Sequence, residues 1–172
     1  TIFEYNNYLS ELKSKFGEYI QDCWVSTMTK LWHYKRGYLL DNKSNKRVLV
    51  MGDRGKKPKL DELDIKILGI LLNNGRIKYI DLARRLKEHP KLIRDRVNKM
   101  IDEEVIIGFT PFYDMSKLNM IYFKVHFKLK NYSMSEFNSL LRYAQTHPNI
   151  IHVVEAVGGA DYEIEVQVQY RV

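Results

Sequence analysis

Residues 89–101 (HPKLIRDRVNKMI) constrain the fold of this chain more than any other stretch. Four apolar residues in it follow the i, i+4, i+7, i+8 spacing of one helical face, namely Ile93, Val97, Met100 and Ile101. Pro90 suits the first helical position, because an N–H would have no partner there. The other side of this helix is polar and carries Lys91, Arg94, Asp95 and Asn98. A helix with a buried back and a polar front is expected to contact a polar partner, and we interpret it as the DNA-reading helix of a helix-turn-helix.

Two helices are expected before it. Asp61 can cap the first, Asp64 follows three residues later as in a capping box, and Leu60 with Ile65 can form a hydrophobic staple. The residues predicted to face inward on this helix, up to the turn NNG at 73–75, are Ile65, Leu68 and Leu72. The second helix repeats the helical spacing with Tyr79, Leu82, Ala83 and Leu86. After the reading helix, the apolar stretch 105–113, interrupted by Gly108, suggests a wing-like β-hairpin.

Positive charge is concentrated around these helices. The net charge is +7, and residues 41–59 alone carry +5, whereas 1–40 and 60–118 carry +1 each and 119–172 carries none. Between Arg76 and Lys99 there are nine cationic and three anionic side chains. A cationic surface attracts polyanions such as nucleic acids, although it can also be a plain solvated surface. Its coincidence with a reading-type helix favours double-stranded DNA as the partner.

The first 59 residues read as a helix, a strand and a linker. Residues 2–16 have helical spacing and end at Gly17, a candidate left-handed cap. Residues 23–34 are rich in β-branched and aromatic residues on both faces, which predicts a strand covered on both sides. The sequence predicts a small hairpin between 38–40 and 47–51, across the turn sequence 41–45. The basic stretch GDRGKKPK at 52–59 is expected to be a domain boundary.

The last third predicts strand, helix, strand and strand. Phe123, Val125, Phe127 and Leu129 alternate with Lys124, His126, Lys128 and Lys130. Ser133 and Glu136 can form a capping box for a helix that buries Phe137, Leu140, Leu141 and Ala144. A strand over 150–157 follows, and after the pair Gly158 and Gly159 a second alternating strand completes the pattern. The first and third strands of this unit are expected to be neighbours, with lysines facing Glu163 and Glu165.

Several segments closely resemble the winged helix-turn-helix of the Lrp/AsnC (leucine-responsive, feast/famine) regulators: LDELDIKIL at 60–68, GRI at 75–77, LARR at 82–85, RV at 96–97 and VI at 105–106. The turn GGADY at 158–162 with its flanking strands is similar to the effector-sensing domain of that family. The resemblance covers roughly residues 60–172. It implies an α+β protein, with a winged helix-turn-helix domain and a ferredoxin-like (βαββαβ) sensing domain.

The resemblance also implies that the sensing domain is split in this chain. Residues 119–172 supply only βαββ, and the missing helix and strand resemble residues 1–40. We interpret the chain as part of a tandem array, whose terminal pieces complete one sensing unit within a chain or between chains; an unrelated N-terminal helix and strand is the alternative. The expected domains are 1–40, a hairpin and basic linker at 41–59, the DNA-binding domain at 60–118 and the βαββ part at 119–172. The charged face of the sheet would then join two subunits.

The chain departs from the family pattern around the turns. Lys87 and Glu104 occupy positions where the family usually has glycine, Lys78 replaces a small polar cap, and His89 replaces a serine cap. These departures leave open a degenerate helix-turn-helix that serves only as a spacer in an assembly module.

The DNA-binding candidates fall into two groups. Arginine can bind guanine and asparagine can bind adenine in the major groove, so the base-edge candidates are Lys91, Arg94, Asp95 and Asn98. Cations around them would contact phosphates, which position a protein without specifying sequence; they are Arg76, Lys78, Lys99, Lys56 and Lys57. The family resemblance adds Gly158 and Asp161 as effector-binding candidates, for which an amino acid is the implied ligand and a tight turn the alternative.

Other classes of function find little support. The five histidines lack ligand spacing and Cys23 is the single cysteine, so we expect no metal site, no cofactor and a reducing, cytoplasmic location. No apolar run approaches the length of a membrane span. Siroheme decarboxylases resemble the same two-domain architecture, but their histidine and arginine motifs are not found between 150 and 172. We therefore expect a non-enzymatic regulator that forms homodimers or higher oligomers.

Overall fold

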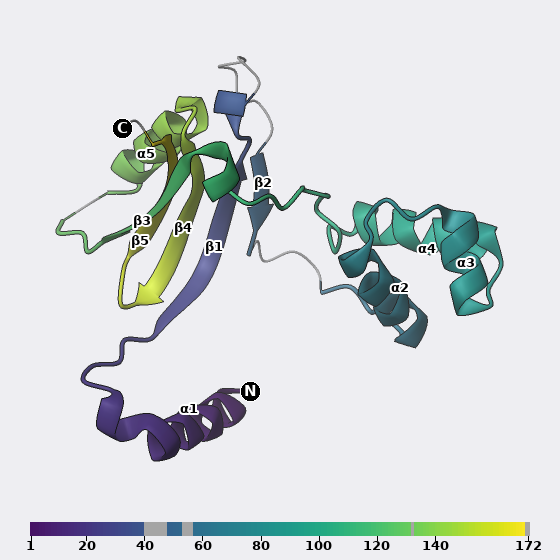
Figure 1. The fold of residues 1–172 in the computed structure, drawn as a ribbon, viewed down its shortest axis with the longest axis horizontal. Helices are drawn as coiled ribbons and strands as arrows, with labels where there is room; N and C mark the ends of the chain where they lie inside the picture. Colours follow the sequence, from purple (N-terminus) through teal and green to yellow (C-terminus); the bar gives the residue numbers. More distant parts are fainter. Residues whose placement is uncertain (40–47, 53–56, 132, 171–172) are drawn as a thin grey trace.

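The computed structural model of the protein describes residues 1–39, 48–52, 57–131 and 133–170. Their apolar side chains form two separate cores, one in a three-helix unit and one in an antiparallel sheet with a helix packed on it. Figure 1 shows the sheet and the three-helix unit beside each other. Among the described residues, no helix is long and apolar enough to cross a membrane.

The three-helix unit consists of α2 (Glu62–Asn73), α3 (Tyr79–Leu86) and α4 (Pro90–Asp102). Asp61 caps α2, and its side chain and that of Asp64 form the predicted capping box. The core of this unit consists of Ile67, Leu82, Ala83, Ile93, Val97 and Met100. Three amphipathic helices therefore bury one shared apolar cluster. The spacing of α3 predicted Leu82 and Ala83 correctly, but Tyr79, also expected to be buried, is 39% exposed.

Other sequence predictions for this unit are also wrong in detail. On α2 the buried apolar residue is Ile67, whereas Ile65 is 57% exposed and Leu72 is 87% exposed. This helix has apolar residues at nearly every position from 63 to 72, so its spacing fits more than one inward face. Ile101 on α4 is also exposed. Residues 105–113 form no strand, and hence no wing, because Val105 and Ile106 pack against the helical core instead.

The sheet is antiparallel throughout, in the order β2-β1-β4-β5-β3. Its strands are β1 (Ser26–Tyr34), β2 (Val48–Met51), β3 (Met120–Phe127), β4 (Ile150–Gly158) and β5 (Tyr162–Gln169). Helix α5 (Met134–Thr146) begins with the predicted capping box of Ser133 and Glu136 and packs on one face. Its Phe137 stacks on Tyr162 and meets Trp32 edge-on. The predicted order of strand, helix, strand, strand over 119–172 is confirmed.

The N-terminal region differs from its sequence predictions at several points. Helix α1 (Ile2–Phe16) forms, capped by Thr1, but Gly17 is right-handed (φ −56°) and starts a short 3-10 helix, η1 (Gly17–Tyr19). Strand β1 is not covered on both sides, since Met28 is 51% exposed. Its hairpin partner β2 pairs with Leu31 to Tyr34, whereas part of the segment expected in that role forms η2 (Gly37–Leu39). The predicted turn at 41–45 lies outside the described residues.

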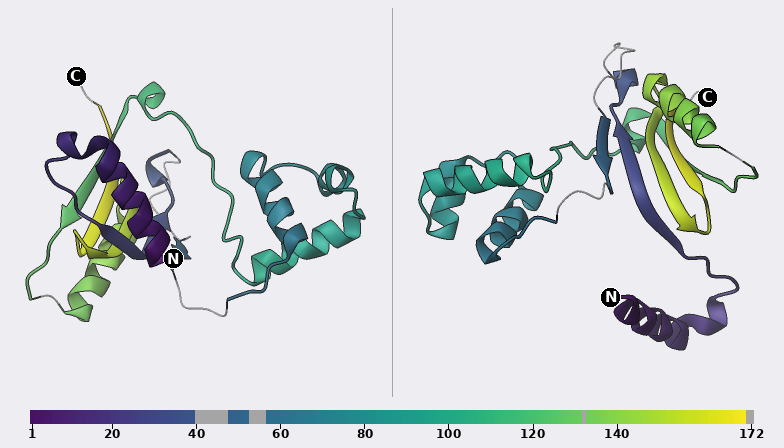
Figure 2. Two further views of the ribbon diagram at one scale, coloured as in Figure 1. Left: turned by 90° about the horizontal axis from the view of Figure 1, so that it is seen from below. Right: turned by 180° about the vertical axis from the view of Figure 1, so that it is seen from behind.

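The position of β1 differs from a ferredoxin-like order. In the βαββαβ sheet, the last strand lies beside the first, which would place β1 next to β3. Instead β1 pairs with β4, and β3 forms the opposite edge of the sheet. Helix α1 stands apart below the sheet, as Figure 1 and the right-hand view of Figure 2 show, and it buries none of its residues.

Candidate nucleic-acid interface

The orientation of α4 is fixed by an ion-pair cluster at the start of α2. The Arg96 guanidinium donates to Asp61 Oδ2 (2.5 Å) and to Asp64 Oδ2 (3.2 Å). Asp64 is only 2% exposed, and the same carboxylate caps the Asp61 N–H. A partly buried arginine shared between two carboxylates limits rotation of α4 about its axis. Arg96 is therefore a positioning residue for the reading helix.

The turn between α3 and α4 is tight in spite of its unusual residues. Lys87 adopts the left-handed conformation (φ 57°), and the Glu88 N–H donates to the Ala83 carbonyl oxygen (3.0 Å). His89 then caps α4, because its Nδ1 accepts from the Lys91 N–H (3.2 Å). The turn thus forms without the glycine and serine that the resemblance implies. The departures from the family pattern at Lys87 and His89 therefore leave the turn between α3 and α4 intact.

The outer side of α4 presents the predicted base-edge candidates together. Lys91, Arg94, Asp95 and Asn98 are all exposed, while Ile93, Val97 and Met100 seal the back of the helix. Arg94 pairs with its neighbour Asp95 (3.2 Å), and both side chains are about half exposed. An exposed pair of this kind contributes little stability, so Arg94 can exchange its partner for a base edge at small cost.

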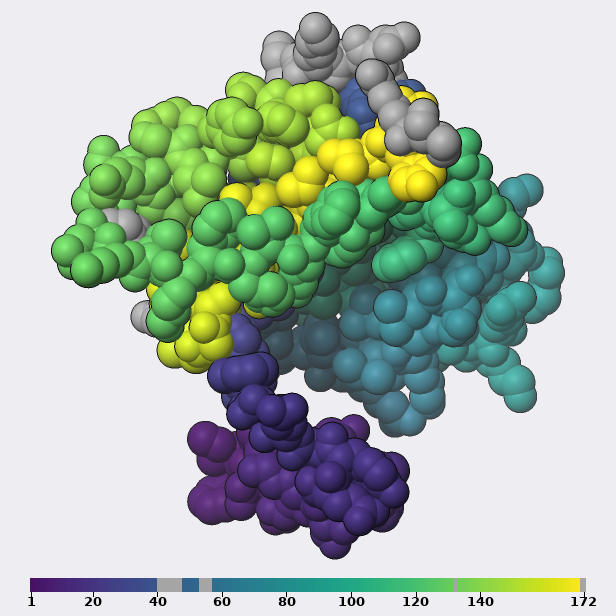
Figure 3. Space-filling view, turned by 60° about the vertical axis from the view of Figure 1, so that its left-hand side comes forward, coloured from purple at the N-terminus to yellow at the C-terminus, as the bar shows by residue number. Residues whose placement is uncertain are grey.

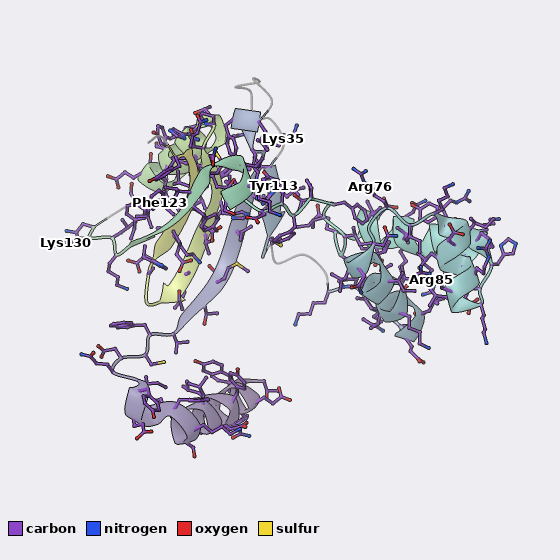
Figure 4. The ribbon with its side chains drawn as sticks, in the orientation of Figure 1. Lys35, Arg76, Arg85, Tyr113, Phe123 and Lys130 are labelled. Atoms are coloured by element: carbon purple, nitrogen blue, oxygen red, sulfur yellow. The ribbon has the colours of Figure 1, made fainter. Side chains whose placement is uncertain are left out.

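A second cationic group surrounds the start of α3. A polar hollow of about 450 Å³ is lined there by Asn74, Arg76, Ile77, Lys78, Asp81, Arg84 and Arg85. Lys78 is the N-cap residue but makes no side-chain cap, so backbone N–H groups remain at this helix start. Arg76 and Arg85, both exposed, belong to this three-helix unit (Figure 4). Arg84, which pairs with Asp81 (3.0 Å), and Arg85 were missed as site residues, although the LARR segment contains them.

The remaining phosphate candidates are more dispersed. Lys99 lies at the C-terminal end of α4, 3.9 Å from a Glu103 carboxylate oxygen. Lys57 is exposed, and Lys56 lies outside the described residues.

The two effector candidates have structural partners within the chain. The Leu129 N–H donates to Asp161 Oδ2 (2.8 Å), and Lys128 Nζ lies 3.2 Å from Oδ1. The backbone hydrogen bond from Leu129, assisted by Lys128, lowers the pKa of Asp161. Gly158 has φ +119°, and a Cβ there would lie 2.1 Å from the Val25 carbonyl oxygen. The contacts of Asp161 therefore link the start of β5 to the end of β3. The absence of a side chain at Gly158 lets the backbone before β1 approach closely.

The class of protein follows from this geometry and from comparison with known sequences. Three helices that present a cationic, exposed reading helix define a helix-turn-helix DNA-binding protein, and residues 60–101 match the AsnC-type helix-turn-helix domain. No group of histidine, cysteine, aspartate or glutamate side chains suited to a metal ion occurs in the described part of the chain.

Relatives and solved structures are similar to part of this chain. The HTH-type transcriptional regulator LrpC of Bacillus subtilis is 29% identical over 112 residues, which cover 64% of this chain and 76% of the relative. LysM of Saccharolobus solfataricus is 41% identical, but over 33% of this chain and 39% of its own length. The structure of E. coli AsnC is similar with a TM-score of 0.54 and 25% identity, covering 66% of this chain and 75% of AsnC. Over the matched residues, this chain is similar to transcriptional regulators of the Lrp/AsnC type.

Proposed function

We propose that the protein is a sequence-specific transcriptional regulator that binds double-stranded DNA through α4. The observation that carries this proposal is the exposed polar face of α4 on a helix whose orientation Arg96 fixes against Asp61 and Asp64. A rigid helix of this kind can enter the major groove, where its side chains meet base edges. The similarity to named transcriptional regulators supports the same assignment.

The proposed DNA contacts fall into two groups, according to where each side chain lies on the three-helix unit. Lys91, Arg94, Asp95 and Asn98 would read bases, because they share the exposed face of α4. Arg76, Lys78 and Lys99 would bind phosphates, and the hollow at the start of α3 adds Arg84 and Arg85 to this group. Phosphate contacts would provide affinity in proportion to the cations used, whereas base contacts would provide sequence preference.

The sheet is proposed to sense a ligand and to support a homodimer or higher oligomer. One structural neighbour is the L-Met complex of the Neisseria meningitidis transcriptional regulator NMB0573, and this likeness, at 20% identity, concerns the fold alone. An amino-acid effector near Gly158 and Asp161 would compete with Lys128 for the Asp161 carboxylate or use backbone groups of the turn. The face opposite α5 carries Glu163 and Glu165 and is the proposed face between subunits.

Selection from a pool of random duplexes tests the proposal. The full chain should enrich one motif, and Asn98→Ala should lose the preference at one or two positions of that motif while retaining binding. Arg142→Ala is the matched control, since Arg142 is an exposed cation on α5, outside the helix-turn-helix. If the wild-type chain enriches no motif and binds every duplex equally, the assignment of α4 as a sequence-reading helix is wrong.

A further inference from the structure

A hollow of about 280 Å³ lies between the sheet and the connecting segment, which we define as residues 108–113 between α4 and β3. In the space-filling view, the green residues that lead into β3 lie between the yellow end of the sheet and the teal three-helix unit (Figure 3). One wall of the hollow belongs to the sheet and the residues after β1, and its members are His33, Lys35, Arg36, Leu39 and Leu49. The other wall is the connecting segment itself.

The sheet wall of this hollow is positively charged. Lys35 and Arg36 both line it, and among the described residues that line the hollow there is no aspartate or glutamate. His33 adds no charge at neutral pH, because burial lowers its pKa to about 4. A concave surface with one sign of charge attracts a ligand of the opposite sign. The hollow therefore favours an anion.

Arg36 is held in a fixed orientation by residues of the chain. Its Nε–H donates to Gln167 Oε1 (3.2 Å), and the Tyr38 hydroxyl donates to the same oxygen. Gln167 is 2% exposed, and the Arg36 guanidinium lies 5.2 Å from the centre of the Tyr113 ring. Gln167 takes one of the five N–H groups of the arginine, and among the described residues no carboxylate forms an ion pair with Arg36. The terminal nitrogens of an oriented guanidinium suit a carboxylate.

The opposite wall is apolar and partly open to solvent. Phe109 and Pro111 line it, and Phe109 is 56% exposed. An apolar wall across from an arginine suits a ligand that has a flat apolar part and one anionic group. The volume lies near the lower end of the roughly 300–1,000 Å³ that small-molecule pockets have, so the hollow suits a molecule with one or two rings.

We propose that this hollow binds a small aromatic carboxylate, with the carboxylate on Arg36 and the ring against Phe109. The orientation of Arg36 by Gln167 reduces the ordering cost of binding, because the guanidinium is already in place. The site does not depend on DNA binding by α4, so it stands or falls separately from the proposed function.

The site is separate from the effector candidates at the turn between β4 and β5. Strand β1 pairs with β4 from Ser26 opposite Gly158 to His33 opposite His152. The hollow contains His33, whereas Gly158 lies at the other end of these paired strands. A ligand in the hollow would therefore leave the turn at Gly158 and Asp161 unoccupied.

The connecting segment also contacts the three-helix unit. Residues 108–111 line a second hollow, of about 540 Å³, on the side of α2. There Phe109 lies against Gly75, where a Cβ would come within 2.7 Å of Phe109 Cδ1. A ring that packs on Phe109 from the sheet side should therefore slow amide hydrogen exchange in residues 108–113 and around Gly75.

Ligand-observed NMR with the full chain tests the site. The probes are benzoate, phenylacetate and indole-3-acetate, and each is compared with its uncharged amide. At least one of the carboxylates should bind with a dissociation constant on the order of 1 mM or lower, as expected for molecules of this size. The same carboxylate should bind at least tenfold more tightly than its amide, because only the carboxylate can pair with Arg36.

Two kinds of variant separate the contribution of charge from that of space. Arg36→Gln should reduce the advantage of the carboxylate over its amide at least tenfold, whereas Arg142→Gln, at an exposed cation on α5, should leave it unchanged. Thr110→Trp introduces a large side chain at an exposed residue that lines the hollow, and it should abolish binding. Phe112→Trp is the matched control, since Phe112 lines the second hollow and not this one.

Three results would overturn the proposal. The first is no saturable binding of any of the three carboxylates, and the second is equal affinity for carboxylate and amide. The third is wild-type affinity in Thr110→Trp. Hydrogen exchange locates the ligand independently of the variants: protection of residues 108–113 supports the site, whereas protection confined to the turn at 158–161 would place the ligand elsewhere and contradict it.

Discussion

His33 Nδ1 on β1 lies 2.5 Å from His152 Nε2 on β4, and His152 Nδ1 is bound in turn to Glu165 on β5. Burial lowers the pKa of His33 to about 4, assisted by the charges of His152 and Arg36 and opposed by Glu165. Burial would raise the pKa of Glu165, but hydrogen bonds from His152 and Tyr122 outweigh it and hold that pKa at about 2. At neutral pH this row therefore joins three strands through a neutral His33 and an ionised Glu165.

The hydrogen-bonded row of His33, His152 and Glu165 predicts that the protein loses stability in mild acid. Between pH 6.5 and 4 the unfolded chain binds a proton at His33 that the folded chain does not, so the free energy of unfolding falls as the pH falls through this window. Because His33 is only partly buried, we expect its contribution to be on the order of 1–2 kcal/mol. His33→Gln should flatten the dependence in urea titrations from pH 7 to 4. An identical slope in wild type and variant would contradict this assignment.

Four non-glycine residues of the described chain have a positive φ, and two of them are not asparagine. Lys87 (φ 57°) and Glu104 (φ 56°) lie in the left-handed region, where a side chain costs about 1 kcal/mol. Lys87→Gly and Glu104→Gly should each raise the free energy of unfolding by roughly 0.5–1 kcal/mol. Thermal melts would show this as an increase of a few degrees. Lys87→Ala is the control, since alanine keeps the strain and should give no such increase.

Removal of residues 1–35 should make the rest of the chain aggregate. Strand β4 would lose its partner along Ser26 to His33 and expose a second sheet edge, and Phe137 would lose its contact with Trp32. Light scattering and sedimentation of the truncated and full chains measure the effect. A truncated chain that is soluble, monomeric and fully folded would show that the N-terminal region is independent of the sheet.

Periodicity predicted most of the elements because amphipathic patterns and capping boxes are local properties. The capping pairs at Asp61 and Ser133 mark α2 and α5. The alternation on β3 and β5 decides which side chains share a face, and Lys124 lies 2.7 Å from Glu163 on the charged face, as expected. Choices that depend on tertiary packing were not predictable in this way. The inward face of α2, the missing wing and the pairing of β1 with β4 all depend on which apolar surface a segment meets.

The candidate site was predicted to a similar extent. The exposed face of α4 follows from its spacing, whereas the role of Arg96 does not, since an arginine near a reading helix can equally contact DNA. Only the structure shows Asp61 and Asp64 holding it. Arg84 and Arg85 were missed because their proximity to Arg76 depends on how α3 packs.

Base and phosphate contacts should separate in binding experiments. Arg94→Ala should reduce the preference for the selected motif over random DNA, by about 1–3 kcal/mol if Arg94 makes a bidentate contact with guanine. Lys78→Ala should weaken binding to all sequences alike, because phosphates carry no sequence information. Fluorescence anisotropy with a specific and a random duplex measures both. If Lys78→Ala changed only the sequence preference, the assignment of the two groups would be reversed.

The salt dependence of DNA affinity tests the central claim most directly. Each phosphate neutralised contributes a slope of about −0.9 in the plot of log K against log salt concentration. A reading helix with supporting cations at Arg76, Lys78 and Lys99 should therefore give a slope of several units for the full chain, and Lys78→Ala should reduce it by about one. An affinity that stays constant across the salt titration would contradict DNA binding through this surface.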